Sequence, residues 1–258
     1  METFFGLSDE AIVITGASGG VGKASALLLS AVAGAKLALV SRRGAEDVVA
    51  EISAAGGLAR SYQADVSSRI ELAHAFKKIA ADFGSVRSLL NIAGTCDFYP
   101  VEAGPAEKSI IDDVRWERIV GVNGKGAALA IEFAVPLMKP GSSIVNVGST
   151  AGSYGAEMAV VDYTFSKAGL VGLTMAYAKI LGPLGIRVNG VAPGPIEGTE
   201  MLAAANEDSL NKIRGTTKLG RLCRPEDVAK IVLFLASQMS AVMTGATVDA
   251  NCGQYISA

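Results

Sequence analysis

The sequence predicts an α/β fold, in which a doubly wound parallel sheet of about seven strands carries helices on both faces. Short apolar runs alternate with longer segments of helical period, and no Pro- or Ser-rich linker interrupts this alternation. Strand–helix alternation implies right-handed crossovers and a parallel sheet that is covered on both sides. The 258 residues match the length of one such unit, so we expect a single domain over residues 1–258.

The expected strands are continuous apolar runs, because both faces of the sheet are buried. They span residues 11–15, 36–40, 58–63, 88–92, 144–147, 187–191 and 246–249. Segments with helical spacing span residues 22–33, 46–55, 68–83, 116–137, 163–181 and 225–237. Two irregular segments, 95–108 and 194–220, each follow a strand. We expect both at the carboxyl edge of the sheet, where open α/β folds bind ligands, with a substrate loop around 194–220.

Composition and charge exclude several classes of protein. Half of the residues are hydrophobic, which is enough for a sizeable core. Lys+Arg 23 against Asp+Glu 25 gives a net charge of -2, which argues against nucleic acid as a partner. The longest uncharged stretch, 231–248, contains Ser, Thr, Gln and Gly and is a poor membrane span. The first ten residues are acidic and form no secretory signal. We therefore expect a cytoplasmic protein with no membrane partner.

The cysteines and the histidine give no metal site. Cys96, Cys223 and Cys252 are odd in number and far apart in sequence, so they predict neither a disulfide framework nor a zinc spacing. His74 is the single histidine, which excludes multi-histidine metal motifs. It lies in a helix-like run and is expected to be an ordinary helix residue.

A glycine-rich turn follows the first expected strand. Gly16, Gly20 and Gly22 fit the pattern Gly-x-x-x-Gly-x-Gly, and Ser18 and Val21 lie within the same turn. Glycines let the backbone approach a pyrophosphate, and the start of the following helix offers free N–H groups and a positive dipole end. The strand–turn–helix context favours a dinucleotide site over the alternative, a tight turn without a ligand.

The end of the second expected strand indicates which dinucleotide binds. A carboxylate usually stands there to bind the ribose 2′-hydroxyl of NAD. This sequence instead has Ser41, Arg42 and Arg43. Ser41 can donate a hydrogen bond and Arg42 can clamp a 2′-phosphate, which favours NADP over NAD. The alternative is a pair of solvated arginines on a loop.

Three groups that can handle a proton cluster at one strand end. Tyr163 and Lys167 are spaced i and i+4 on one helix face, and Ser149 follows the strand before that helix. Holding a tyrosine as phenolate near pH 7 requires lowering its pKa by about 3 units, to which a nearby ammonium contributes. Ser149 can bond a substrate oxygen. The alternatives are an amphipathic Tyr–Lys pair at the core edge and a nucleophilic Ser149 that would have to use His74.

With these motifs in their order along the chain, the sequence resembles the short-chain dehydrogenase/reductases of about 250 residues, which have a Rossmann-like fold. Residues 15–22 resemble the cofactor loop of that family, and Ser149, Tyr163 and Lys167 match three members of its catalytic tetrad. Further matches to the tetrad asparagine and to cofactor-contacting segments are Asn123, Asp65, Val66, Asn91, Ala93, Gly94, Pro193, Gly194, Ile196 and Thr199.

The resemblance implies a role for each tetrad residue. Tyr163 would be the general acid in carbonyl reduction and the base in alcohol oxidation. Lys167 would bind the nicotinamide ribose and lower the pKa of Tyr163. Ser149 would orient the carbonyl, and Asn123 would hold a water that links Lys167 to solvent. The resemblance also implies a homodimer or homotetramer formed through the helices at 116–137 and 163–181.

Three departures from the family pattern stand out. The spacing from Ser149 to Tyr163 is one residue longer than expected, so the loop 153–162 is expected to bulge. An extra Gly198 precedes Thr199 and could shift its contact with the carboxamide. Ile92 stands where many members have a second Asn.

The substrate is less well defined by the sequence. The contacts are expected from Cys96, Phe98, Tyr154, Met158, Val160, Met201 and Leu202. A mostly apolar pocket suits an uncharged ketone or secondary alcohol, unless these residues pack within their own loops. The expected function is NADPH-dependent interconversion of a ketone and a secondary alcohol. Two alternatives stay open: a 3-ketoacyl or enoyl/dienoyl thioester reductase of the same family, and a non-catalytic NADP-binding sensor or interaction protein.

Overall fold

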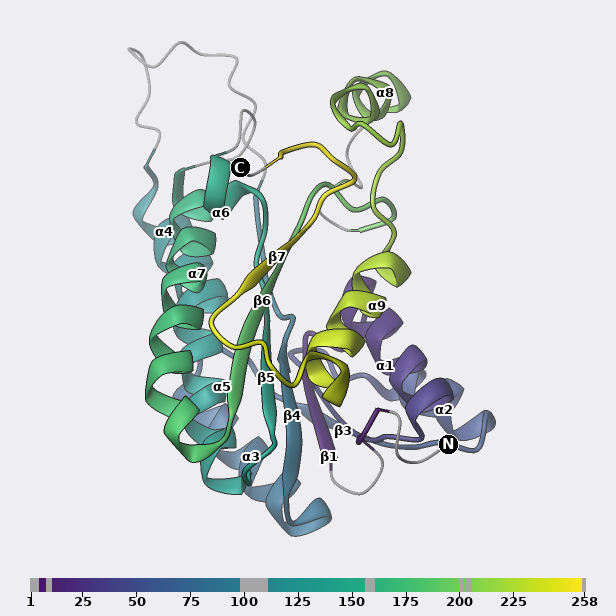
Figure 1. Cartoon of the computed structure of the whole chain (residues 1–258), viewed down its shortest axis with the longest axis vertical. Coiled ribbons are helices and arrows are strands. Elements are labelled where there is room, and N and C mark those ends of the chain that lie inside the picture. The colour runs from purple at the N-terminus through teal and green to yellow at the C-terminus, as the bar shows by residue number, and fades with distance from the viewer. Residues whose placement is uncertain are drawn as a thin grey trace.

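The fold is a parallel sheet of seven strands between two layers of helices (Figure 1). The computed structural model describes residues 5–7, 11–97, 111–155, 161–199, 202 and 206–256. The strand order is β3-β2-β1-β4-β5-β6-β7, and every pairing is parallel. The strands are β1 Ala11–Thr15, β2 Lys36–Ser41, β3 Leu58–Gln63, β4 Val86–Asn91, β5 Ser143–Val147, β6 Arg187–Pro193 and β7 Thr247–Ala250. The predicted fold class is therefore confirmed.

The strands form where apolar runs can be buried on both faces. All five residues of β1 and of β5 are buried, whereas the edge strand β3 alternates between exposed and buried positions. The strand order reverses between β1 and β4, because the chain crosses from β3 at one edge to β4 in the middle. This reversal opens a crevice at the carboxyl ends of these strands, where ligands bind in such sheets.

The helices divide between the two faces of the sheet. The core on one face includes α1 Gly20–Ala33, α2 Glu46–Ala54 and α9 Pro225–Ala236. The core on the other face includes α3 Arg69–Phe83, α5 Gly126–Ala134 and α7 Val161–Leu181, with α4 Asp113–Val120 packed against α7. The shorter helices are η1 Gly121–Lys125, η2 Val135–Leu137, α6 Ala151–Tyr154, η3 Gly182–Leu184, α8 Glu207–Thr216 and η5 Gln238–Ser240.

The helix expected at 116–137 differs from the prediction in its start and its interior. It begins at Asp113, where the Asp112 side chain accepts a hydrogen bond from the Arg115 N–H. A π-helical turn, Gly121–Lys125, interrupts it and contains Asn123. Such turns occur often at functional sites, because they rotate one side chain away from the regular helix face. No sequence period signals this turn.

The same helical stretch is the one described segment, Asp113–Leu137, that is long and apolar enough to cross a membrane by length and composition. It packs beside the sheet: α4 and the π turn contact α7, and α5 contacts α3. A place in the helical layer therefore accounts for its apolar composition.

The segment 194–220, expected to be irregular, contains the helix α8. Asn206 caps it by accepting a hydrogen bond from the Ser209 N–H at 2.9 Å, and Glu207 and Asp208 occupy the first turn. None of its residues is buried, and its two apolar side chains, Leu210 and Ile213, are too few to show a helical period. Of the other irregular segment, residues 98–108 lie outside the described residues.

Candidate active site

The four tetrad residues come together at the carboxyl ends of β4 and β5. Ser149 lies two residues after β5, Tyr163 and Lys167 lie in the first turns of α7, and Asn123 lies in the π turn. Tyr163 is only 6% exposed and Lys167 only 4%. The Ser149 side chain stands close enough to the Tyr163 phenol to lower its pKa. The Lys167 Nζ donates to the Val147 carbonyl oxygen at 2.9 Å and lies 5.8 Å from the centre of the Tyr163 ring.

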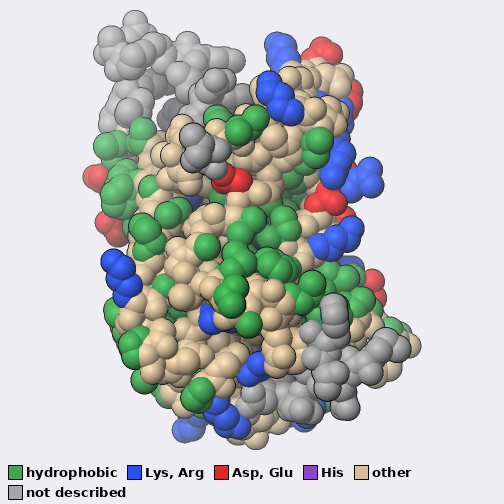
Figure 2. All heavy atoms as spheres, in the orientation of Figure 1, with side chains coloured by type: hydrophobic (Ala, Val, Ile, Leu, Met, Phe, Trp, Pro, Cys, Tyr) green, Lys and Arg blue, Asp and Glu red, His purple; other side chains and the backbone are tan. Residues whose placement is uncertain are grey.

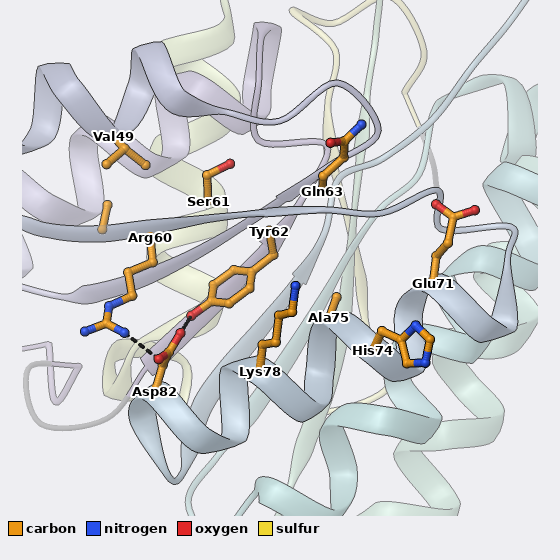
Figure 3. A pocket seen from close by; sticks show the side chains of 11 residues that line it. Val49, Arg60, Ser61, Tyr62, Gln63, Glu71, His74, Ala75, Lys78 and Asp82 are labelled. Carbon is orange, nitrogen blue, oxygen red and sulfur yellow. Dashed lines mark hydrogen bonds and ion pairs between the residues drawn. The ribbon is translucent and has the colours of Figure 1, made fainter.

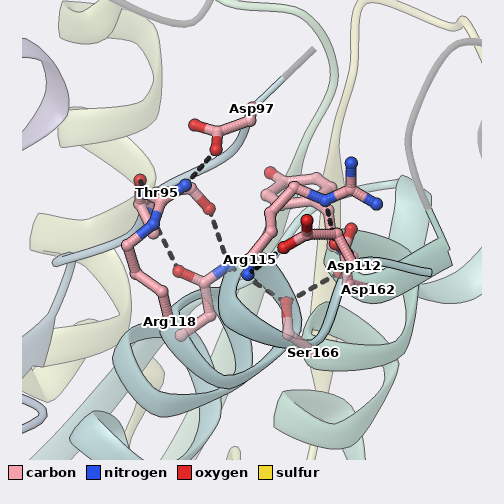
Figure 4. Close-up of polar contacts among 9 residues, drawn as sticks. Thr95, Asp97, Asp112, Arg115, Arg118, Asp162 and Ser166 are labelled. Atoms are coloured by element: carbon pink, nitrogen blue, oxygen red, sulfur yellow. Dashed lines mark hydrogen bonds and ion pairs between the residues drawn. The ribbon is translucent and has the colours of Figure 1, made fainter. Parts of the chain in front are cut away.

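Asn123 connects the segment after β4 with α7 (Figure 4). Its Nδ2 donates to the Thr95 carbonyl oxygen at 2.9 Å and to the Ser166 Oγ at 3.0 Å, and its Oδ1 accepts from the Thr95 N–H at 2.8 Å. A Cβ on Gly94 would lie 3.4 Å from both the Asn123 Oδ1 and the Lys167 Nζ, so these two side chains flank the same small space. The π turn thus brings Asn123 next to Lys167.

Burial drives Tyr163 and Lys167 toward their neutral forms. Desolvation raises the pKa of Tyr163 to about 12, against the smaller opposing effect of the Ser149 side chain. Desolvation lowers the pKa of Lys167 to about 8. Burial thus acts against the lowered tyrosine pKa that the family resemblance implies, and that lowering stays a prediction. At pH 7 the phenol is protonated and the amine is still mostly charged, which suits proton donation by Tyr163.

The glycine turn fits a dinucleotide. Gly16 has φ +71°, and a Cβ there would lie 2.7 Å from the Ala93 Cα. A Cβ on Gly22 would lie 2.1 Å from the Gly16 carbonyl oxygen, so α1 can start so close to β1 only with glycine there. Gly19 and Gly20 are exposed, and neither α1's cap nor its first turn supplies a carboxylate. The N–H groups at the start of α1 are therefore available for a pyrophosphate.

The end of β2 has the arrangement expected for a 2′-phosphate. Ser41 is buried, and Arg42 and Arg43 are exposed beside it. The nearby Glu46 carboxylate accepts a hydrogen bond from the Ser61 Oγ at 2.9 Å. Asp65 lies after the neighbouring β3, where its Oδ1 accepts from the N–H and Oγ of Ser67, and Val66 behind it is buried.

The side chain of Asn91 links neighbouring elements of the fold. Its Nδ2 donates to the Ala127 carbonyl oxygen at 3.3 Å and to the Asn146 Oδ1 at 3.0 Å, and Asn146 in turn donates to the Thr174 Oγ1. Its side chain therefore ties β4 to β5 and α5 rather than facing the crevice, which leaves only its main chain for a cofactor. Ala93 and Gly94 follow it toward the crevice.

The segment after β6 closes over the glycine turn. A Cβ on Gly20 would lie 3.7 Å from the Thr199 Cγ2, and the Thr199 Oγ1 bonds the Ile196 carbonyl oxygen at 2.9 Å. Thr199 thus reaches the cofactor turn despite the extra Gly198. Pro193 and Gly194 are held next to it, because the Pro193 carbonyl oxygen accepts from Thr150 and the Gly194 N–H donates to Ala250.

The substrate side is described in part. Cys96 is half-buried and packs with Tyr163, Ile119 and Ala151. Leu202 is half-buried, whereas four other expected contacts, as well as the loop 156–160 where a bulge was expected, lie outside the described residues. Those four contacts are Phe98, Met158, Val160 and Met201.

Tyr154 has a partner that the sequence did not indicate. Its ring stacks on that of Tyr255, with centres 5.1 Å apart and planes 6° from parallel, and its OH bonds Asp249 at 2.9 Å. Residues near the C-terminus therefore pack against Tyr154 on the substrate side of the site.

Two other pairings are revealed only by the structure. Cys223 and Cys252 have their Sγ atoms 3.5 Å apart although they are 29 residues apart in sequence, and both are free thiols. Arg115 and Asp162 form a buried ion pair directly beside Tyr163. No local sequence pattern indicates that pair, because both residues precede the segments predicted as helices, 116–137 and 163–181.

A separate groove of about 710 Å³ lies between β3 and α3 (Figure 3). It contains Tyr62, Asp82, Lys78 and His74, and the Tyr62 OH bonds Asp82 at 2.5 Å. None of the tetrad residues lines it, and His74 is an exposed residue of α3, as expected. Among the described residues, no group of three or more His, Cys, Asp or Glu is placed to hold a metal ion.

Comparison with known proteins agrees with this geometry. Residues 16–254 match the family described as enoyl-(acyl carrier protein) reductase. The chain is 35% identical to the 3-oxoacyl-[acyl-carrier-protein] reductase FabG of Thermotoga maritima, over 97% of this chain and 99% of that protein. It is also 35% identical to the L-rhamnose 1-dehydrogenase (NAD(P)(+)) of Azotobacter vinelandii, over 97% and 98%. The chain belongs to the short-chain dehydrogenase/reductase family.

A solved structure supports the same assignment. A short-chain dehydrogenase from Burkholderia cenocepacia, in complex with NADP, matches with a TM-score of 0.86 and 28% identity, over 96% of this chain and 98% of that one. The protein is therefore an oxidoreductase of a family that binds nicotinamide cofactors.

Replacing Lys167 by Met tests the burial of its charge. The pKa of Lys167 is about 8 in the folded protein and 10.5 in the unfolded chain, so the unfolded chain binds more protons between these values. Wild-type stability therefore rises with pH across this window, whereas the variant lacks that gain. We expect Lys167→Met to be more stable than wild type by about 3 kcal/mol at pH 7, with the difference shrinking toward pH 10.

Urea unfolding at pH 7, 8.5 and 10 measures this difference. Lys23→Met, which removes an exposed lysine paired with Glu51, serves as the control and should change little. A stability difference between Lys167→Met and wild type that does not vary with pH would contradict the prediction.

Proposed function

We propose that this protein is an NADPH-dependent oxidoreductase that interconverts a ketone and a secondary alcohol. The observation that supports this most directly is the buried Tyr163 with Ser149 close to its phenol and the Lys167 Nζ 5.8 Å from the centre of its ring. A carbonyl oxygen placed against Tyr163 and Ser149 would meet a proton donor and a second hydrogen-bond donor. We further propose that the whole chain is one domain with a substrate loop around 194–220.

Each tetrad residue has its own role in the proton transfer. A bound nicotinamide cofactor supplies or accepts the hydride. In reduction, Ser149 holds the carbonyl oxygen and Tyr163 delivers a proton to it as negative charge develops there. The Lys167 ammonium stabilises the phenolate that remains, and Asn123 keeps the neighbouring main chain in place. In oxidation, the phenolate of Tyr163 removes the hydroxyl proton, so this direction should speed up with pH.

The cofactor preference rests on the end of β2. Arg42 and Ser41 offer a charge and a hydrogen bond to a 2′-phosphate, and Glu46, the nearby acid, is turned toward Ser61. The glycine turn, Asp65, Val66, Asn91, Ala93, Gly94 and the segment from Pro193 to Thr199 would hold the rest of the dinucleotide. The NADP complex of the Burkholderia relative agrees with this preference, whereas the Azotobacter relative is named for NAD(P)(+) and favours neither dinucleotide.

A thioester reductase is the second candidate, because the Thermotoga relative is a 3-oxoacyl-[acyl-carrier-protein] reductase. Acyl carrier protein is acidic and favours a basic approach to the site. The described side chains packed with Tyr163, namely Ile119, Ala151 and Cys96, are uncharged and suit an uncharged substrate. We therefore rank a free ketone or alcohol first.

A homo-oligomer also belongs to this proposal. Large apolar side chains are exposed on α4 and α7, among them Val114, Phe165, Met175 and Ile180. Apolar side chains also gather on the face that carries β7 (Figure 2). Two subunits that meet through these helices, as a dimer or within a tetramer, would cover this surface.

Oxidation of NADPH and of NADH at 340 nm, against a panel of ketones, tests the proposed function. The panel runs from cyclic and aryl ketones through ketosteroids to acetoacetyl-CoA. Fastest turnover of a free ketone with NADPH would support it, whereas fastest turnover of the thioester would favour the second candidate. NADPH binding without any turnover would favour the non-catalytic binding protein.

Replacing Tyr163 by Phe should abolish reduction and spare NADPH binding. The substitution removes only the acidic hydroxyl, so turnover should fall by 10²-fold or more. The readouts are turnover and the fluorescence titration of NADPH. Tyr62→Phe, in the groove between β3 and α3, is the matched control and should keep its activity. Substantial turnover by Tyr163→Phe would refute the acid–base assignment.

Replacing Arg42 by Asp should reverse the cofactor preference. The change removes the partner of a 2′-phosphate and supplies a carboxylate for a 2′-hydroxyl, so the kcat/KM ratio of NADPH to NADH should fall about 100-fold or more. Arg60→Asp makes the same charge change within β3 and should leave the ratio unaltered. An unchanged ratio in Arg42→Asp would rule out the clamp.

A further inference from the structure

A buried ion pair links α4 to α7 directly beside the catalytic tyrosine. The Arg115 Nε donates to the Asp162 Oδ2 at 2.6 Å, and Arg115 and Asp162 are only 8% and 1% exposed. Figure 4 shows the Arg115 and Asp162 side chains next to each other, and Tyr163 follows Asp162 in the sequence. Removing one partner of a buried ion pair destabilises the fold, because it leaves an uncompensated charge in the protein interior.

The same carboxylate holds the main chain of Tyr163. The Asp162 Oδ1 accepts from the Tyr163 N–H at 2.7 Å, while the Tyr163 carbonyl oxygen accepts from the Ser166 Oγ at 2.7 Å. Ser166 is in turn bonded by Asn123. The N–H and the carbonyl oxygen of Tyr163 are therefore both held by side chains, the first by Asp162 of the ion pair and the second by Ser166, which Asn123 bonds in turn.

The pair also affects the electrostatics of the site. Among the residues that the structure describes, the charged and titratable groups around Tyr163 are Lys167 and Asp162 on its own helix, Arg115 on α4, and Cys96 and Asp97 after β4. Burial and, after it, the charge of Asp162 raise the pKa of the Cys96 thiol to about 11, while Lys167 and Arg115 act in the opposite direction. Cys96 packs against the cluster that contains Tyr163, and its own charge acts on the phenol, so Cys96 links the ion pair to Tyr163 electrostatically.

We propose that Asp162 and Arg115 are positioning residues of this active site: the carboxylate fixes the main chain of Tyr163, and the guanidinium cancels its charge beside the phenol. This inference rests on the proposed acid–base role of Tyr163. It predicts that the pair matters to catalysis through its charge balance as well as through its packing.

Asp162→Asn is the sharpest variant. The amide keeps an oxygen that can accept from the Tyr163 N–H, and its shape is nearly unchanged, but the cluster gains one positive charge. A guanidinium stays protonated at every accessible pH, so it cannot relieve that change. We expect the pH profile of alcohol oxidation to move about one unit lower, because added positive charge favours the phenolate.

The double variant Arg115→Met/Asp162→Asn separates charge from packing. It restores the net charge of the cluster while leaving the ion pair absent, so its pH profile should return to within about 0.3 unit of wild type. Arg69→Met is the matched control, since it removes an exposed arginine–carboxylate pair with Glu132 between α3 and α5. It should leave the pH profile unchanged.

Alkylation of Cys96 by iodoacetamide gives a second readout that needs no substrate. The thiolate fraction well below the pKa changes tenfold per unit, so Asp162→Asn should speed alkylation about tenfold at pH 8, and the double variant should reverse this. Mass spectrometry of the peptide that contains Cys96 resolves it from Cys223 and Cys252.

These outcomes separate the two proposals. A wild-type protein without turnover would overturn the proposed function, while Cys96 alkylation would still test the charge balance. An alkylation rate in Asp162→Asn equal to that of wild type, or an increase that the double variant retains, would overturn the inference. So would an unshifted pH profile in an active Asp162→Asn.

Discussion

The meeting of β1 and β4 at the reversal of strand order is the constraint on which the rest of the site depends. The Thr15 Oγ1 accepts the N–H groups of Ile92 and Ala93 at 3.1 and 3.2 Å, and the absent side chain of Gly16 lets the two segments touch. The glycine turn and the segment that leads to Thr95 and Cys96 are therefore fixed relative to each other. A side chain at position 16 would push the cofactor turn and the tetrad apart.

The chemistry of the site comes from burial as much as from residue identity. An exposed tyrosine beside a lysine would have its pKa lowered by the ammonium, but here desolvation of the phenol is the larger effect. The pKa of about 12 for Tyr163 and of about 8 for Lys167 leave both groups protonated at pH 7. Under the proposed function, the protonated phenol is the form that donates to a carbonyl, and positive charge near it favours the phenolate that alcohol oxidation needs.

The sequence predicted those parts of the molecule that leave a local pattern. The central strands and the tetrad could be predicted because buried apolar runs and fixed motif spacings are visible along the chain. The helix α8 was missed because none of its residues is buried, and the π turn at Asn123 because it interrupts no apolar period. Arg115 and Asp162 are 47 residues apart, so only the packing of α4 on α7 brings them together.

That packing also bears on why a charged pair lies at this position. Two apolar side chains of similar volume would fill the space between α4 and α7 without the cost of desolvating two ions. They would, however, leave the Tyr163 N–H without its acceptor in the first turn of α7, where main-chain N–H groups lack helical partners. A carboxylate alone would satisfy that N–H but would add a negative charge close to the phenol and to Lys167. The arginine resolves this conflict, because it cancels the charge and leaves the hydrogen bond in place.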